Sequence, residues 1–179
     1  MRKQHTTEKP VIIVVFHKSL DEFSKVAIIK AIQSTFNADI SIASINIDLK
    51  AAYNVYRKQY DAEKIFEILQ ELSSNTIFLG ALGFDLYVNE LNFVFGVAMP
   101  YRGAVMSTWR LQTNNMELYS LRILKTVRHE LGHVFGLLHC DGPCVMRFAN
   151  SLMELDAKPA TFCKKCRYKL VSFSILKQG

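Results

Sequence analysis

The sequence of 179 residues lacks any apolar run that approaches the length needed to span a membrane, about 20 residues for a helix. Its run VIIVVF, at residues 11–16, is followed at once by His17 and Lys18 and is too short for the core of a signal peptide. From these two absences we expect a soluble, cytoplasmic protein without a membrane partner.

Internal repeats, low-complexity tracts and an obvious linker are also missing. Half of the residues are apolar, which is enough to bury one core, while the length leaves little room for two full domains. We therefore expect a single domain over residues 1–179, acting as a monomer.

Charge of one sign is concentrated at only one place. The net charge is +6, but basic and acidic residues are interleaved along most of the chain. The dense basic cluster consists of Lys164, Lys165, Arg167 and Lys169. We interpret it as a solvated helix face, so a nucleic-acid partner is not expected, although a nucleic-acid contact remains the alternative.

Cysteine is absent from the first 139 residues, and all four cysteines follow in the last quarter of the chain: Cys140, Cys144, Cys163 and Cys166. A reducing cytoplasm keeps such residues as thiols, and clustered thiols there usually bind metal. The two close pairs, CxxxC and CxxC, match a closed tetrahedral structural zinc site. Unliganded buried thiols or a redox pair are the alternatives.

The first 108 residues predict alternating strands and helices. We expect a strand at 11–16, a helix at 21–36, a strand with a bulge at 39–48 and a helix at 60–73, an order that favours a parallel sheet. Residues 76–108 form short β-rich runs with no room for helices, which indicates an antiparallel or mixed edge. The predicted apolar stripe of the first helix is Phe23, Val26, Ile29 and Ile32.

A long helix is predicted from about residue 115 to 137. Asn114 and Glu117 form a capping-box-like start. Its expected apolar stripe is Leu121, Leu124, Val127, Leu131, Val134 and Leu138. At about 100° per residue, His129 and His133 lie on roughly the opposite side, facing away from the main core.

The end of this helix carries the main chemical signal, HELGHVFGLLH at residues 129–139. His129 and His133 are one helical turn apart and can converge on one ion. A catalytic zinc needs three protein ligands, and Gly136 can end the helix with a positive φ so that His139 swings back as the third. Glu130, beside a ligand, can act as general base for water in amide hydrolysis.

The run HELGHVFGLLHC, with Cys144, Met146 and the later CxxC, resembles the archaemetzincin family of metzincin zinc metallopeptidases. The resemblance implies a catalytic zinc on three histidines, with Glu130 as base, and a second zinc on four cysteines. It also implies that Met146 forms a hydrophobic floor beneath the histidines. The implied ligands are His129, His133 and His139 for the first ion and Cys140, Cys144, Cys163 and Cys166 for the second.

The same resemblance implies the fold class, α/β with α+β character. A metzincin-like zincin has a twisted mixed β-sheet, backing helices, a long active-site helix and a small C-terminal subdomain with a structural zinc. We expect subdomains at about 1–136 and 137–179. In metzincins a substrate strand pairs with the sheet edge above the active helix, and NFVFGVAM at 92–99 is the candidate edge, an ordinary interior strand being the alternative.

Three functions follow from these residues. The first is a zinc metallopeptidase acting on a peptide or protein substrate with two zinc ions. The second is a zinc-binding protein of the same fold with little or no proteolytic turnover. The third, from another class, is a nucleic-acid-binding zinc protein that uses the basic stretch around Cys163 and Cys166.

Overall fold

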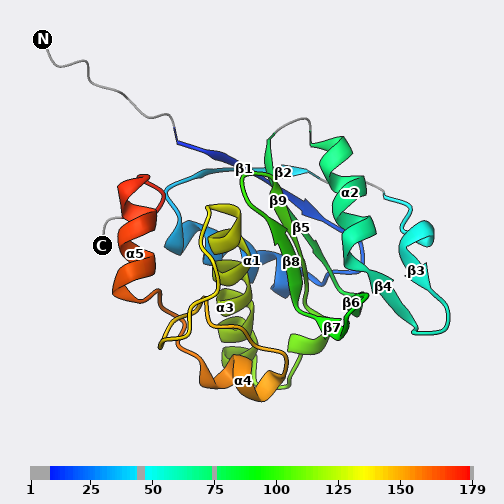
Figure 1. Cartoon of the computed structure of the whole chain (residues 1–179). Helices are drawn as coiled ribbons and strands as arrows, with labels where there is room; N and C mark the ends of the chain where they lie inside the picture. Colours follow the sequence, from blue (N-terminus) through cyan, green and yellow to red (C-terminus); the bar gives the residue numbers. More distant parts are fainter. Residues whose placement is uncertain (1–8, 44–46, 74–75, 178–179) are drawn as a thin grey trace, which may run out of the picture.

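The computed structural model describes residues 9–43, 47–73 and 76–177. Its main layer is a five-stranded sheet that runs through the centre of the molecule (Figure 1). In spatial order the strands are β2 (Asp39–Ala43), β1 (Val11–Phe16), β5 (Ile77–Leu82), β9 (Gly103–Ser107) and β8 (Gly96–Met99). The first four are parallel, and β8 runs antiparallel to β9 at the edge. The predicted parallel core is confirmed, and β8 gives the sheet the mixed edge expected within residues 76–108. The other two strands of this sheet from that stretch, β5 and β9, are interior parallel strands and not part of an edge.

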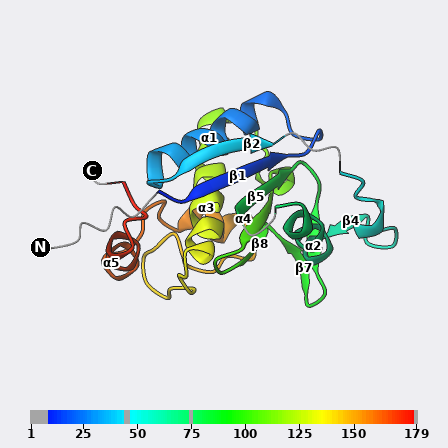
Figure 2. The ribbon, with the colours of Figure 1, turned by 90° about the horizontal axis from the view of Figure 1, so that it is seen from above.

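Helices cover both faces of this sheet (Figure 2). On one face lie α1 (Glu22–Thr35) and α3 (Met116–Val134), which pack on each other and share the larger apolar core with Ile12, Val14 and Leu79. On the other face α2 (Ala62–Leu72) packs against a smaller core that contains Phe78 and Val105. Because β1, β5 and β9 are covered on both faces, their residues are almost all apolar.

A second, four-stranded sheet lies beside α2. Its strands, in spatial order, are β3 (Tyr53–Asn54), β4 (Gln59–Asp61), β6 (Leu86–Val88) and β7 (Leu91–Val94). Two short 3₁₀ helices, η1 (Lys50–Ala52) and η2 (Trp109–Leu111), complete this part of the chain. The sheet edge predicted at 92–99 is confirmed for β8, the outermost strand of the large sheet, and the alternative of an interior strand is wrong. The prediction is wrong for the first part of the run, because the chain passes from β7 in the small sheet to β8 in the large one at Phe95. The ring of Phe95 is buried in the larger core, which fixes this crossing point.

Two other boundaries differ from the expectation. The strand expected at 39–48 ends at Ala43, and the expected bulge lies at residues 44–46, outside the described part of the chain. The helix expected at 60–73 begins at Ala62, because Asp61 caps it by accepting hydrogen bonds from the backbone N–H groups of Glu63 and Lys64.

The predicted stripe of α1 is wrong at Phe23 and Val26 but confirmed at Ile32, and Ile29 is partly buried against the core. Phe23 and Val26 are 38% and 51% exposed, whereas the buried residues of α1 are Ser24, Ile28, Ala31, Ile32 and Thr35. Positions three apart drift by about 60° per step around a helix, so four of them do not share one face. Ser24 can lie inside because its hydroxyl bonds to Asp21 and to the hydroxyl of Tyr119 on α3, each at 2.7 Å.

The long helix α3 begins one residue later than expected, at Met116. Its N-cap is Asn115, whose side chain accepts a hydrogen bond from the N–H of Leu118. The predicted stripe is wrong at Leu121, which is 37% exposed, and at Leu138, which lies beyond the helix and is 75% exposed. Since α3 is enclosed by α1, by β8 and β9 and by the C-terminal segment, it is buried on several sides, polar residues included.

The C-terminal segment wraps around α3 and carries α4 (Leu152–Ala157) and α5 (Lys164–Ser172) (Figure 1). Val145, Met146, Leu155 and Leu170 are buried in the same core as α1 and α3. The four residues of the basic cluster all lie on the exposed surface of α5.

Within the described residues, no helix has the length and apolar character needed to cross a lipid bilayer.

Candidate metal centre

Three histidines meet at the C-terminal half of α3. His129 and His133 come from successive turns of the helix, and His139 comes from the loop that follows it. One ring nitrogen from each lies within 4.8 Å of those of the other two. The Nε2 atoms of His129 and His133 are 3.1 Å apart. The three residues predicted as a group are therefore brought together.

Hydrogen bonds from the Nδ1 atoms of two of these rings fix the orientation of the rings. Nδ1 of His129 donates to the backbone oxygen of Val145 at 2.9 Å, and Nδ1 of His133 donates to that of Leu137 at 2.8 Å. A carbonyl oxygen can only accept, so the proton of each neutral ring is on Nδ1 and the two Nε2 lone pairs face each other. Two acceptors this close repel unless a cation lies between them, so the donor set fits a metal ion.

The charge state of the rings agrees with this assignment. Burial lowers the pKa of His129 to about 2, helped by the charge of Lys158. Burial likewise lowers the pKa of His133 and of the exposed His139. Neutral imidazoles are the form that binds metals.

The chain reaches His139 through a tight turn at Gly136. Gly136 has φ of +86°, a conformation that residues with a side chain resist, and its N–H donates to the oxygen of His133. Leu137 then donates back to the oxygen of Gly132, which closes the end of the helix. The predicted positive φ at Gly136 is confirmed.

Glu130 points from α3 toward β8 and is 5% exposed. A Cβ placed on Gly96 of β8 would lie 2.7 Å from Cδ of Glu130, so only glycine leaves room for this carboxyl group. Burial raises the pKa of Glu130 to about 8, and the positive charge of Lys158 opposes that rise. A carboxyl group whose pKa lies near neutral, beside imidazoles that can bind a metal, can take up and release a proton.

Met146 is fully buried beneath the helix. A Cβ added to Gly132, which lies between the first two histidines in sequence, would be 2.4 Å from Sδ of Met146. The backbone oxygen of Met146 accepts a hydrogen bond from Cys140, the residue after His139. Met146 thus packs against the turn of α3 that carries the histidines.

The four cysteines form a second group, directly next to the first. Their Sγ atoms all lie within 4.8 Å of one another, and those of Cys140 and Cys163 are 3.8 Å apart. All four are free thiols. Two backbone N–H groups, of Cys163 and Met146, donate to Sγ of Cys144 at 3.2 and 3.5 Å.

The pKa values of the thiols in this group are shifted in opposite directions. A hydrogen bond from the backbone of Cys166 lowers the pKa of Cys163 to about 7, whereas burial raises the pKa of Cys166 and of Cys144. Four sulfurs at this spacing, with backbone donors directed at one of them, can hold a metal in a closed tetrahedral site.

A cleft of about 530 Å³ runs along the histidine group. Exposed residues Leu138, His139 and Phe148 lie at its mouth, and strand β8 forms one wall. Its inner end is lined by Thr126, Leu155 and Lys158, each no more than 5% exposed. The cleft therefore connects solvent with both the histidines and a buried polar recess.

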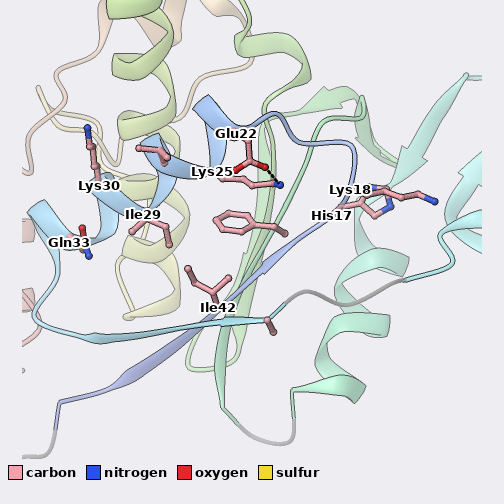
Figure 3. A pocket seen from close by; sticks show the side chains of 11 residues that line it. His17, Lys18, Glu22, Lys25, Ile29, Lys30, Gln33 and Ile42 are labelled. Carbon is pink, nitrogen blue, oxygen red and sulfur yellow. Dashed lines mark hydrogen bonds and ion pairs between the residues drawn. The ribbon is translucent and has the colours of Figure 1, made fainter.

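A larger hollow of about 1020 Å³ lies elsewhere, between α1 and β2 (Figure 3). Its lining combines apolar side chains such as Ile29 and Ile42 with Lys18, Lys30 and the Glu22–Lys25 ion pair. None of its lining residues belongs to either metal-binding group. The three histidines and Glu130 line the smaller cleft instead.

Lys158 is the main site residue that sequence analysis missed. Its ammonium nitrogen, Nζ, lies 3.3 Å from Nδ1 of His129 and donates a hydrogen bond to the backbone oxygen of Arg147 at 3.0 Å. Burial lowers its pKa to about 8, so the ammonium form still predominates at pH 7. A single lysine in the segment MELDAKPA carries no motif, and its burial depends on how the C-terminal segment folds against α3.

Comparisons with known proteins agree with this geometry. A model of peptidase family M54 matches residues 11–172. The archaemetzincin of Nanoarchaeum equitans is 40% identical over 145 residues, 81% of each chain, and that of Archaeoglobus fulgidus is 42% identical over 137 residues, 75% of this chain and 83% of the relative.

Solved structures are similar over nearly the whole chain. The archaemetzincin of Archaeoglobus fulgidus, in complex with malonate, is 37% identical with a TM-score of 0.81, over 89% of this chain and 99% of the other. The archaemetzincin of Methanopyrus kandleri is 32% identical with a TM-score of 0.82, over 93% and 96%.

Proposed function

This chain belongs to peptidase family M54, the archaemetzincins, and is a zinc metallopeptidase; we propose that it hydrolyses peptide bonds at the three-histidine group. The observation that carries the proposal is the convergence of three neutral imidazoles beside a buried carboxyl group, all lining one cleft.

In this proposal His129, His133 and His139 hold one zinc ion through the nitrogens that face one another. When bound, the ion supplies Lewis acidity, which polarises the scissile carbonyl and lets water lose a proton near neutral pH. The Val145 and Leu137 carbonyls keep two of the rings aimed at the ion, since each fixes the proton on Nδ1.

Glu130 acts as the general base. Its carboxylate takes a proton from water as the oxygen attacks the carbonyl carbon, and then gives that proton to the leaving nitrogen. Gly96 keeps the opposing wall close to this carboxyl group, which excludes bulk water around it. Because burial raises the pKa of Glu130, its carboxylate accepts a proton more readily than that of an exposed glutamate.

The substrate is a peptide or protein that binds along the cleft in an extended form. Strand β8 supports this arrangement, since it pairs with β9 on one side and is the last strand of its sheet. Its outer backbone groups can pair with a substrate strand.

We further propose that a second zinc ion is held by Cys140, Cys144, Cys163 and Cys166, as a structural site. The whole chain then works as one peptidase domain, in which residues of about 1–136 supply the sheet and the active-site helix and 137–179 the third histidine and the cysteines. A cytoplasmic location agrees with this proposal, because the cysteines must stay reduced to bind zinc.

Metal analysis joined to peptide-library profiling tests the proposal. The parent and the Glu130→Gln protein should both contain two zinc ions per chain, and only the parent should cleave peptides. Cleavage by Glu130→Gln at the parent's rate on a confirmed substrate would contradict the mechanism. Two retained zinc ions with no cleavage of any peptide by the parent would instead support a zinc-binding protein without turnover.

A further inference from the structure

Lys158 places a positive charge at the closed end of the cleft. It is the C-cap residue of α4, its backbone N–H donates to the oxygen of Glu154, and the whole residue is 5% exposed. Its side chain lines the cleft together with Thr126 and Leu155. One imidazole ring, that of His129, separates its ammonium group from the position where the three histidines converge.

The other two buried cations of this region are matched by the protein itself. Arg122 forms a two-pronged ion pair with Asp156, with bonds of 2.8 and 2.6 Å. Lys125, 3% exposed, donates to the backbone oxygens of Leu155 and Asp156 at 3.0 and 2.8 Å.

The ammonium group of Lys158 has fewer partners within the protein. Among the described residues no carboxylate oxygen lies within 4.0 Å of its ammonium group. It has three N–H donors but only one proper acceptor, the oxygen of Arg147, since Nδ1 of His129 already donates its own proton to Val145. The charges of Glu130 and Cys144 act on Lys158 and oppose the effect of burial on its pKa, but no carboxylate pairs with it directly. A buried ammonium group without a direct carboxylate partner keeps N–H donors that a ligand can use.

The rest of the cleft indicates what that ligand is. Its lining is largely apolar and includes Phe95 and Val97, at and beside β8, and Leu137 and Phe148, which follow α3 in the chain. A substrate group that reaches the inner end must pass this apolar lining and then meet an ammonium group. A short apolar chain that ends in a carboxylate has the matching chemistry.

We propose that Lys158 is a specificity-determining residue, which pairs with a carboxylate of the peptide substrate at the inner end of the cleft. The carboxylate comes from an acidic side chain next to the scissile bond or from the C-terminus of the residue beyond that bond. This inference rests on the proposed peptidase function, because it assumes that substrate lies in the same cleft. Lys158 lies on the Nδ1 side of His129, away from the Nε2 atom that faces His133, so its proposed role is to bind substrate and not to act on the reacting atoms.

Hydrolysis of matched peptides by the zinc-loaded full chain tests the proposal. One set compares Glu with Gln at each position near the scissile bond, and a second compares a free C-terminus with an amide, so that the two sources of carboxylate are distinguished. In one of the sets, the parent should favour the acid over its neutral isostere on the order of 10- to 100-fold, as expected for a charged hydrogen bond shielded from water. Lys158→Met should bring this ratio to about 1, and Lys158→Arg should restore part of it.

Lys125→Met is the matched control, because it removes a buried lysine that does not line the cleft. It should leave the acid-to-isostere ratio as in the parent. A Lys158→Met protein that loses kcat/KM equally on acidic and neutral peptides, together with a lowered Tm, would overturn the proposal in favour of a purely structural role.

A binding measurement separates this inference from the peptidase function. The Glu130→Gln protein is titrated calorimetrically with a pair of peptides that differ only in Glu versus Gln, or only in acid versus amide. Tighter binding of the acidic member, lost in Glu130→Gln/Lys158→Met, supports the carboxylate pairing even if the parent hydrolyses nothing. Equal binding of both members, or binding of neither, overturns it.

Discussion

The backbone oxygen of Val145 accepts a hydrogen bond of 2.9 Å from Nδ1 of His129. Val145 stands directly between Cys144 of the sulfur group and Met146, which packs under α3. On the other side, one peptide bond joins His139 to Cys140, whose N–H donates to the oxygen of Met146. The two groups are thus joined at two points, so the positions of the cysteines are linked to those of His129 and His139.

This connection predicts that the sulfur group affects the histidine group. Cys163→Ser should release one zinc equivalent per chain, lower the Tm, and weaken the remaining zinc on the order of 10-fold, because the partner of His129 moves. Metal analysis and competition with a chromogenic chelator measure these effects. Lys164→Ser, at the exposed residue next to Cys163, is the control and should leave the zinc content, the Tm and the zinc affinity unchanged. An unaltered metal content in Cys163→Ser would contradict the structural-zinc assignment.

Gly96→Ala should reduce turnover without loss of zinc. The added methyl group would lie 2.7 Å from Cδ of Glu130 and 2.7 Å from the oxygen of Val105, so the carboxyl group must move away from β8. A displacement of this size at a catalytic group lowers kcat by a factor on the order of 100. Gly142→Ala is the control, because its new Cβ meets only Sγ of Cys140, at an ordinary 4.0 Å. Equal kcat in the two variants would show that Glu130 needs no such precise placement.

Gly136→Ala should destabilise the turn that delivers His139. Its φ of +86° costs a residue with a Cβ about 1–2 kcal/mol, and the methyl group would also lie 2.7 Å from the hydroxyl oxygen of Tyr101. We expect a lower free energy of unfolding in urea and weaker zinc binding. Asparagine tolerates positive φ better, so Gly136→Asn in a Tyr101→Phe background should lose less stability. The reverse order would refute the backbone explanation.

The ion pair between Asp156 and Arg122 predicts a pH dependence of stability. The side-chain hydrogen bonds from Arg122 hold the pKa of Asp156 below its ordinary value. Its stabilising contribution is therefore complete above the unfolded pKa of about 3.9 and is lost as the pH falls through the lower folded value.

Replacing the Asp156 carboxylate tests the direction of this pH dependence. Asp156→Asn should lower the free energy of unfolding by about 1 kcal/mol at pH 7, a modest value because Asp156 is partly exposed. The difference from the parent should shrink at pH 3. Urea unfolding at both pH values, with a chelator present throughout, measures it, and a difference independent of pH would contradict the assignment.

The sequence predicts most of the site because its signals are local. Ligands at i and i+4 on a helix, a glycine at a required positive φ and closely spaced cysteine pairs are set by backbone geometry over a few residues. The same holds for the parallel pairing of β1 and β2, since the alternation of strands and helices leaves few topologies.

What the sequence did not predict depends on contacts between distant segments. Lys158 and Gly96 reach the site only because the C-terminal segment and β8 pack on opposite sides of α3. The burial of Ser24 in α1 has no local signal, because its hydroxyl group is hydrogen-bonded to that of Tyr119, 95 residues away. Phe95, where the chain changes sheets, lies within an unbroken run of strand-forming residues.

His139 differs from the other two histidines in being exposed, at the mouth of the cleft and in contact with the ring of Phe148. His129 and His133 are held half-buried by carbonyl partners on a helix that is enclosed on several sides. An incoming ion would therefore meet two ligands already in place and a third on a loop. The kinetics of metal exchange should follow the motion of this loop, residues 136–140, and leave the helix undisturbed.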